Sequence, residues 1–423
     1  MRGPFTGLWR NPDFVKLWAG ETISIFGSLV GRTALPFTAI LVLDAGPIQI
    51  ALLSTAELAP AFIAGPVVGV WVDRLRRRPI LIASDVGRAL LLATVPLAHL
   101  LDVLYIEQLY VVAFLVGILT MLFDVAYLSY LPSLVSRGEL LEGNSKLAAS
   151  SSVAEVGGFS LSGWLVQLVT GPITILIDAF SFLFSAAFVA AIRAPEPPPV
   201  PSKERRSVRA EFIEGLNLVL KDRVQRAVAA ASVTLEFSFR VFGGVYLLYV
   251  TRELGFKPGL LGMIFAVGGL SSLAGALLVR LGARRLGVGT SMWGGLILMG
   301  GSMLFIPLAQ GATVLAASFL VAQQLVGDGG ATVFEVNQVS LRQAITPGHV
   351  LGRVNASIRL SALVAMLLGS LLAGLLGETI GLRATLAVGA GFALAAALWL
   401  LLSPVRALRD VPLIVSEPPA AAD

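Results

Sequence analysis

The sequence predicts an all-α integral membrane protein with twelve transmembrane helices in two pseudo-symmetric six-helix bundles. The chain of 423 residues is 56% hydrophobic and only 13% charged, and its apolar residues form about twelve runs of membrane-spanning length. A soluble fold of this size cannot bury so much apolar surface. The absence of cysteine excludes disulfides and Cys-based zinc sites, and the two histidines, His99 and His349, lie too far apart in sequence to indicate a metal centre.

Each apolar run is long enough to cross a bilayer, which takes roughly 20 residues. Some runs contain Gly or Pro, which bundled membrane helices tolerate. The first run is too long for a signal peptide and has no small-residue cleavage site. The predicted spans are 14–42, 48–72, 79–101, 106–135, 144–170, 172–193, 224–251, 258–280, 287–308, 312–337, 352–378 and 382–403.

The connectors between the spans alternate between basic and nearly uncharged. Arg74, Arg76, Arg77 and Arg78 follow the second span, whereas only Thr-Gly-Pro separates the fifth span from the sixth. Because Lys and Arg accumulate on the cytoplasmic side, this alternation predicts a multi-pass protein of the cell (inner) membrane with both termini in the cytoplasm. The net charge of +5 is therefore a sign of topology and not of a nucleic-acid partner.

A hydrophilic segment divides the spans six and six. It begins with the proline-rich Ala194-Pro195-Glu196-Pro197, which is typical of a stiff connector. It continues as a charged stretch with Phe212, Leu216, Val219 and Leu220 at helical spacing, which predicts an amphipathic helix on the cytoplasmic face. The predicted domains are an N-terminal bundle (1–193), a linker (194–223), a C-terminal bundle (224–405) and a cytoplasmic tail (406–423).

The two halves also resemble each other in sequence. Parallel six-helix repeats with a binding site between them are a known plan for transporters. Four residue pairs are separated by 211 positions: Asp124 and Glu335, Asn144 and Asn355, Gly158 and Gly369, and Gly163 and Gly374.

The loop after the second span carries a motif. It reads Gly69-Val70-Trp71-Val72-Asp73-Arg74-Leu75-Arg76-Arg77-Arg78. The sequence here resembles the major facilitator superfamily, whose loop signature is Gly-x-x-x-Asp-Arg/Lys-x-Gly-Arg/Lys-Arg/Lys. Gly69, Asp73, Arg74, Arg77 and Arg78 match it, and Arg76 stands where Gly is usual. The resemblance implies a secondary active transporter that works by alternating access.

Three shorter stretches are similar to the macrolide-efflux and enterobactin-exporter branch of that superfamily. They are Asn11–Phe14, Glu214–Leu216 and Asn355–Ser357. This similarity implies proton-coupled antiport and multidrug-type efflux of an amphipathic or hydrophobic small molecule, either a drug or a siderophore-like compound. The antiporter signature has Gly-Pro near the centre of the fifth span, whereas Gly157–Gly163 contains no proline.

Asp73 offers a test of what the loop motif does. The motif is either a gate, in which Asp73 meets an arginine or a helix N-terminus and holds the inner ends together, or a simple topology anchor that needs only the arginines. If it is a gate, Asp73→Asn should reduce transport while the protein still inserts into the membrane. Unchanged transport by this variant would leave only the anchor.

Ionisable residues inside spans are costly and therefore indicate function. By the resemblance, spans one, four, seven and ten line the cavity, and an alternative is that the charges form a structural ion-pair network. We expect Glu236 beside Arg240, and then Asp328, to be the proton-titrating groups. The predicted substrate and proton cavity consists of Arg32, Glu57, Glu236, Arg240, Asp328 and Gln324.

The other intramembrane charges have different expected roles. Asp124 and Glu335 lie near the inner ends of their spans, where they are expected to form salt bridges with the arginine-bearing loops. Asp85 and Arg88, three residues apart, are expected to pair for structural reasons. Asp178 is expected to reach the outer interface.

The chain has no sequence motif of an enzyme. No ATP-binding loop, zinc motif or Gly-x-Ser-x-Gly elbow is present. We therefore expect a non-enzymatic monomer, with no cofactor and no metal, that is driven by the proton gradient. Its expected partners are a small-molecule or lipid substrate, protons and membrane lipids, with no nucleic acid. The alternative function is a lysophospholipid or other lipid flippase on the same fold.

Overall fold

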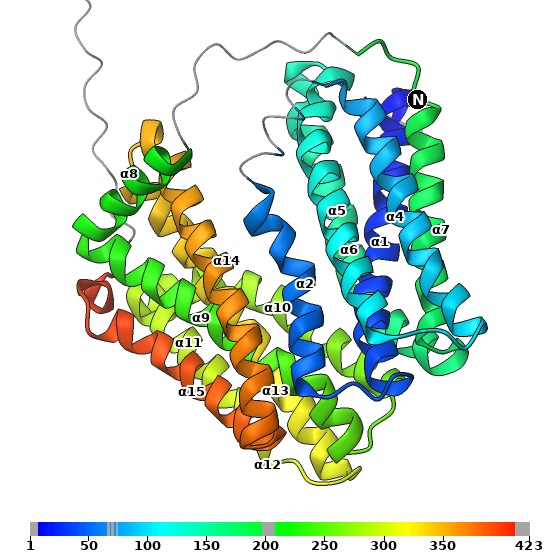
Figure 1. Ribbon diagram of the computed structural model, residues 1–423. Coiled ribbons are helices and arrows are strands. Elements are labelled where there is room, and N and C mark those ends of the chain that lie inside the picture. Colours follow the sequence, from blue (N-terminus) through cyan, green and yellow to red (C-terminus); the bar gives the residue numbers. More distant parts are fainter. Residues whose placement is uncertain (1–6, 66–67, 69–71, 73–74, 197–207, 411–423) are drawn as a thin grey trace, which may run out of the picture. The chain divides into compact units, whose positions relative to one another are not determined.

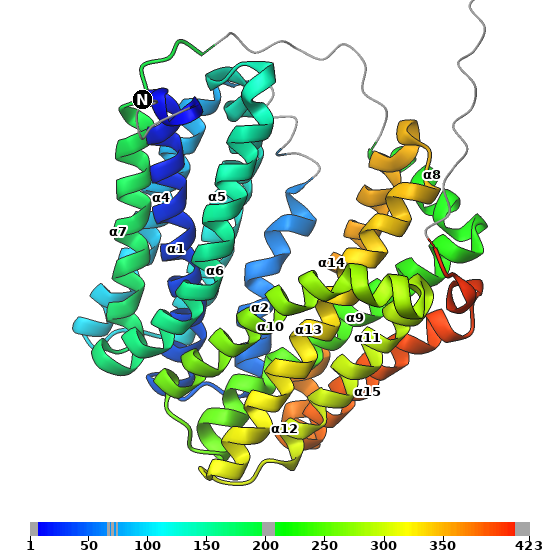
Figure 2. The same cartoon turned by 180° about the vertical axis from the view of Figure 1, so that it is seen from behind.

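The computed structural model describes residues 7–65, 68, 72, 75–196 and 208–410, and this part of the chain contains helices and no strands (Figures 1 and 2). A π-helical turn, η3 (Tyr249–Glu253), continues α9. The helices are α1 (Pro12–Leu41), α2 (Pro47–Ile63), α4 (Arg77–Leu100), α5 (Ile106–Leu134), α6 (Leu140–Val169), α7 (Gly171–Ala190), α8 (Val208–Lys221), α9 (Arg223–Leu248), α10 (Pro258–Leu286), α11 (Val288–Met303), α12 (Phe305–Leu308), α13 (Val314–Ile345), α14 (Gly348–Thr379) and α15 (Leu382–Leu401).

Every predicted span overlaps a helix of the described residues, and the all-α membrane fold is confirmed. Among the described residues, nine helical segments are long and apolar enough to cross a membrane. The helices α2, α6 and α13 fall short of that measure: α2 is described only to Ile63, and α13 carries Gln323, Gln324 and Asp328 in its apolar part. The count of twelve spans therefore stays a prediction.

The Asn11–Phe14 stretch determines how α1 begins. The Asn11 side chain accepts hydrogen bonds from the backbone N–H groups of Asp13 and Phe14, and its own amide donates to the Leu134 carbonyl (3.1 Å). The Asp13 carboxylate accepts from the backbone N–H groups of Arg193 and Ala194 beyond the end of α7. Each residue satisfies helix-end groups that would otherwise lack partners.

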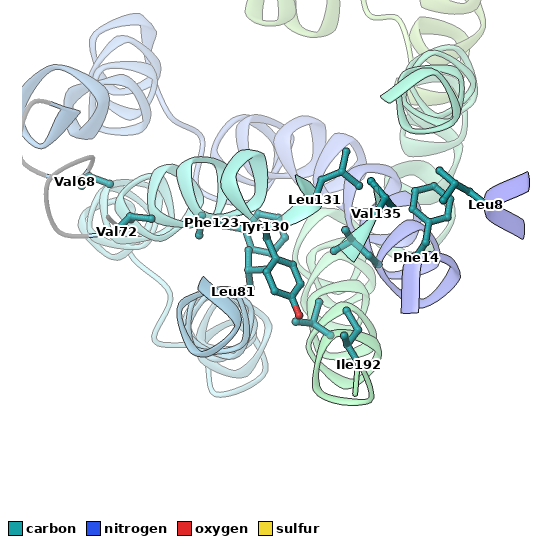
Figure 3. Packing of buried hydrophobic residues seen from close by; sticks show 13 residues of the cluster. Leu8, Phe14, Val68, Val72, Leu81, Phe123, Tyr130, Leu131, Val135 and Ile192 are labelled. Atoms are coloured by element: carbon teal, nitrogen blue, oxygen red, sulfur yellow. The ribbon is translucent and has the colours of Figure 1, made fainter. Parts of the chain in front are cut away.

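A buried apolar cluster joins these same helix ends (Figure 3). Phe14 of α1, Leu81 of α4 and Tyr130 of α5 are at most 1% exposed. Ile192, just beyond α7, closes the cluster from another side. The N-terminal helices are therefore fixed against one another by side-chain packing, which is the main force between helices in a membrane.

Contacts divide the chain into two compact units with limits unlike those predicted from sequence. Unit 1 comprises Met1–Arg205, Gly244–Ala266 and Ser370–Leu382, and unit 2 comprises Arg206–Gly243, Val267–Gly369 and Arg383–Asp423. One end of each of α9, α10 and α14 thus belongs to unit 1. The predicted bundle limits follow the order of the spans, whereas the units follow packing.

Two glycines explain why the ends of α10 and α14 belong to unit 1. A Cβ on Gly163 of α6 would overlap the Pro258 carbonyl oxygen and lie 2.9 Å from the Gly262 nitrogen, both in α10. A Cβ on Gly374 of α14 would lie 3.3 Å from the Pro47 carbonyl oxygen and 2.6 Å from the Ala51 Cβ, both in α2. Small residues allow such close helix contacts.

These two contacts repeat each other. Pro47 and Pro258 are 211 residues apart, as are Ala51 and Gly262, and as are the two glycines that contact them. The contacts between α6 and α10 and between α14 and α2 are therefore made by the same positions of the repeat. This agreement supports the internal duplication independently of sequence identity.

The predicted amphipathic helix is α8, and it packs within unit 2. Val219 is 3% exposed against Val354 and Ile358, whereas Leu220 points outward and is 47% exposed. Gly215 lies directly on the Arg353 backbone, and the Ser357 hydroxyl donates to the Phe212 carbonyl at 2.9 Å. The Glu214–Leu216 and Asn355–Ser357 stretches thus lie at one contact between α8 and α14.

Candidate functional site

The described half of the loop motif is a helix start. Gly69, Asp73 and Arg74 lie outside the described residues. The backbone N–H groups of Arg77 and Arg78 donate to the Glu196 carboxylate at 2.5 and 3.2 Å. A carboxylate is favoured at a helix N-terminus by the helix dipole. Sequence reasoning missed Glu196, whose only signal is a single acid inside a proline-rich connector.

Arg32 and Glu57 form an exposed pair in unit 1. Arg32 Nε lies 3.3 Å from Glu57 Oε1, and their side chains are 63% and 43% exposed. They come from α1 and α2. An exposed pair contributes little to stability, at most about 1 kcal/mol. Its position inside two spans therefore needs an explanation other than folding.

The remaining predicted cavity residues lie together in unit 2. Glu236 interacts electrostatically with Arg240, one helical turn along α9, and with Glu335 of α13. Glu335 in turn interacts with Asp328. The charge group of unit 2 is defined as these four residues, in which Glu236 lies beside Arg240 and Glu335 links Glu236 to Asp328.

Gln324 belongs to the edge of this group. It is buried, and with Asp328 it packs directly against Gly268 of α10, where a Cβ would lie 2.5 Å from the Gln324 side-chain nitrogen. Sequence reasoning missed the adjoining polar chain in which Arg342 donates to Gln338 and to Asn355 Oδ1 (3.2 Å). The spacing of Gln338 and Arg342, one helical turn apart, was the available signal.

Asp124 and Glu335 are both exposed. Among the described residues, Glu236 acts electrostatically on Glu335, and Glu335 acts on Asp328. Asp124 acts electrostatically on Glu21 of α1. Salt bridges from Asp124 and Glu335 to the loop arginines stay a prediction.

The structure pairs Asp85 with Arg88 and corrects the expectation for Asp178. Arg88 Nη2 donates to Asp85 Oδ1, and the two side chains are almost fully buried. Asp178 does not reach an interface: it is 5% exposed and its carboxyl group packs against Gly27 and Gly31 of α1. Because these glycines have no side chain, α1 leaves the space that the carboxyl group fills.

Each unit also contains a large apolar groove. A groove of about 930 Å³ in unit 1 lies between α1, α6 and α7 and includes Phe26, Phe180 and Phe184. A second groove, of about 720 Å³, lies between α10, α11 and α13 in unit 2. Neither groove is lined by the predicted cavity residues.

Known proteins are similar to this chain in sequence, and solved structures are similar to it in fold. The chain is 26% identical over 391 residues to the multidrug efflux pump Tap of Mycolicibacterium fortuitum, covering 90% of this chain and 92% of Tap. It is 25% identical over 392 residues to an uncharacterized MFS-type transporter, YfiS of Bacillus subtilis, covering 88% and 89%.

Solved structures agree on the architecture. A bacterial homologue of the iron transporter ferroportin, in its inward-facing state, matches with a TM-score of 0.74 at 19% identity over 92% of this chain and 98% of that chain. The nucleoside transporter NupG matches with a TM-score of 0.75 at 13% identity over 92% and 98%. The family model of the Major Facilitator Superfamily matches residues 18–334. Loop motif, helical membrane fold and family match agree, and the chain belongs to the major facilitator superfamily of membrane transporters.

Proposed function

We propose that this transporter exports an amphipathic or hydrophobic small molecule across the cell (inner) membrane, in exchange for protons and by alternating access. The charge group of unit 2 carries the proposal, because its three carboxyl groups interact in series within predicted spans, where ionisable side chains are costly and indicate function. The similarity to the multidrug efflux pump Tap supports efflux as the direction.

Proton coupling follows from the chemistry of such a group. A carboxyl group shielded from water favours its neutral form, and an adjacent guanidinium favours its ionised form. If Arg240 changes its distance from Glu236 between two states of the transporter, Glu236 binds a proton in one state and releases it in the other. Asp328, whose charged neighbour is Glu335, is the second candidate for the titrating group.

Alternating access needs helix contacts that can close and open. In unit 1, Arg252 Nη2 pairs with Asp44 Oδ1 at 2.6 Å, and Gln167 Oε1 accepts from the Gly259 backbone N–H at 3.0 Å. With the Gly163 and Gly374 contacts, they form what we call the outer closure. The proposal places this closure on the outer side, keeps both termini in the cytoplasm and treats the protein as a monomer.

The function can be tested with purified protein in vesicles that carry an imposed pH gradient. Dyes, macrolides, siderophores and lysolipids are added one at a time, and movement of each compound is followed together with the pH inside. Dissipation of the gradient on addition of a drug or siderophore would support antiport. Movement of a compound without any change in pH would contradict proton coupling.

Two neutral substitutions test the charge group of unit 2. Glu236→Gln and Asp328→Asn should each reduce pH-driven movement of the identified compound at least about ten-fold, a loss of about 1.4 kcal/mol of coupling, because neither amide can exchange a proton. Glu253→Gln, at an exposed position of η3, serves as the control and should behave as the parent protein. Unchanged pH-driven movement in both variants would remove these residues from the mechanism.

The apolar groove of unit 1 favours a lipid as the second candidate substrate. Phe180 and Phe184 of α7 line it, and its volume of about 930 Å³ suits an acyl chain. On this alternative the protein is a lysophospholipid flippase. In the same vesicles, a response to lysolipids alone would select it.

A further inference from the structure

A second set of buried charges lies in unit 1 and includes none of the predicted cavity residues. Asp85 and Arg88 of α4 are 0% and 3% exposed, and Asp178 of α7 is 5% exposed. Glu21 of α1 interacts electrostatically with Arg88, and its Oε2 is shielded from solvent. We call Glu21, Asp85, Arg88 and Asp178 the buried acid cluster. Of the helices that carry it, α1 and α4 each pack against α7 (Figures 1 and 2).

Arg88 is held in a fixed position at the centre of the cluster. Its guanidinium carbon lies 4.4 Å from the centroid of the Phe123 ring and 4.0 Å from that of Phe182. It donates to Asp85 Oδ1, and its Nη1 donates to Thr120 Oγ1 at 3.4 Å. Asp85 and Arg88 therefore already form a complete pair of opposite charges.

Glu21 and Asp178 are carboxyl groups in excess of that pair. Both interact electrostatically with Arg88, and both are also close enough to interact with Asp85. One guanidinium neutralises one carboxylate. A further carboxylate shielded from water is stable only if it binds a proton or another cation.

The described structure leaves several polar atoms of the cluster without hydrogen bonds. Glu21 Oε2, Asp85 Oδ2 and Arg88 Nε are buried and have no partner. The Ser185 hydroxyl of α7, which is 0% exposed, faces Asp85. A fully bonded structural network leaves no such atoms.

The surroundings favour a proton over a metal ion. No group of three His, Asp or Glu side chains in the described part of the chain is arranged to hold a metal. Asp124 and Tyr127 of α5 also face the cluster and interact electrostatically with Glu21. The Ser181 hydroxyl of α7 donates to Asp178 Oδ1 at 3.4 Å. The Glu155 side chain of α6 lies outside the described part.

We infer that Glu21 and Asp178 are exchangeable proton sites built around the fixed pair of Asp85 and Arg88. The inference rests on the proposed proton-coupled function and adds a proton site distinct from the charge group of unit 2. Each carboxyl group takes up one proton from water and returns it, with no change in any other bond.

Proton binding can be measured without knowing the transported compound. Purified protein in weakly buffered detergent is shifted from alkaline to acidic pH, and proton uptake is followed with an indicator dye. Glu21→Gln and Asp178→Asn should each bind about one proton fewer than the parent protein. Glu107→Gln, at an exposed position of α5, is the control. It tests whether removing an ordinary exposed acid changes proton uptake over the same pH range as the cluster variants do. Uptake by the cluster variants identical to that of the parent would overturn the inference.

Transport in vesicles separates this inference from the proposed function. With ethidium as probe, Glu21→Gln and Asp178→Asn should lose at least about ten-fold of pH-driven movement and retain ethidium exchange without a gradient. Retained pH-driven movement would overturn the inference and leave the proposed function intact. Absence of pH coupling with every compound in the parent protein would contradict the proposed function itself. Equal loss of exchange and of thermal stability in both variants would identify a structural network and overturn the inference.

Discussion

Gly163→Ala is expected to reduce transport about 5-fold to 150-fold while the protein still inserts and folds. The new Cβ would overlap the Pro258 carbonyl oxygen and lie 3.0 Å from the Gly262 Cα. Backbone atoms cannot move aside as a flexible side chain can, so α6 and α10 must separate. Overpacking of this kind costs roughly 1–3 kcal/mol. This free energy corresponds to a change of about 5-fold to 150-fold in the population of a conformational state.

This free-energy cost destabilises the conformational state in which the outer closure is formed. Transport of the compound identified in vesicles is the first measurement, and hydrogen exchange is the second. Amides at the start of α10 should exchange faster in Gly163→Ala than in the parent protein. Gly374→Ala should have the same effect at the start of α2, because its contacts with Pro47 and Ala51 repeat those of Gly163.

Gly157→Ala is the matched control for the outer closure. Gly157 lies in the same helix as Gly163, and its nearest neighbour would be a Phe26 ring carbon at 3.9 Å, an ordinary contact. This variant should transport and exchange hydrogen as the parent does. If Gly163→Ala and Gly157→Ala behave alike, close packing of α6 on α10 has no part in transport.

Arg88→Met is expected to be the most destabilising single substitution among the charged residues discussed. It removes the positive partner of Asp85, which is 0% exposed, and the ring contacts with Phe123 and Phe182. Breaking a buried ion pair from one side costs about 3–5 kcal/mol. We expect a lower yield and a clearly lower thermal unfolding temperature in detergent.

A double substitution distinguishes loss of the pair from loss of packing. Asp85→Asn combined with Arg88→Met removes both charges, so it should be more stable than Arg88→Met alone. Arg359→Met, at an exposed position of α14, controls for the loss of an arginine within a span and should leave the unfolding temperature nearly unchanged. Equal stability of Arg88→Met and the parent protein would show that Asp85 does not need this partner.

The positions of the spans were predictable because each depends only on local composition. Twenty apolar residues between polar connectors form a membrane helix whatever their neighbours are. The pairing of Asp85 with Arg88 was predictable for the same reason, since residues three apart lie on one helix face. The start of α1 at Asn11 and Pro12 likewise follows from capping preferences.

The environment of Asp178 was not predictable from its own helix. Whether an acid in α7 faces water or protein depends on what α1 presents to it, and Gly27 and Gly31 are 147 or more positions away in the chain. The same limit applies to Glu196, whose partners are the backbone N–H groups of Arg77 and Arg78. Contacts of this range are set by packing, and a single sequence carries no period or spacing that reveals them.

The paired contacts of Gly163 and Gly374 also bear on ancestry. In a symmetric dimer, a residue on one copy contacts a second residue on the other, and the reverse contact is made by the same two positions. Gly163 on Pro258 and Gly374 on Pro47 follow this rule once the 211-residue offset is removed. This pattern is expected if a six-helix progenitor formed a homodimer through this surface. A later gene fusion then kept the two equivalent contacts while the remaining surfaces diverged.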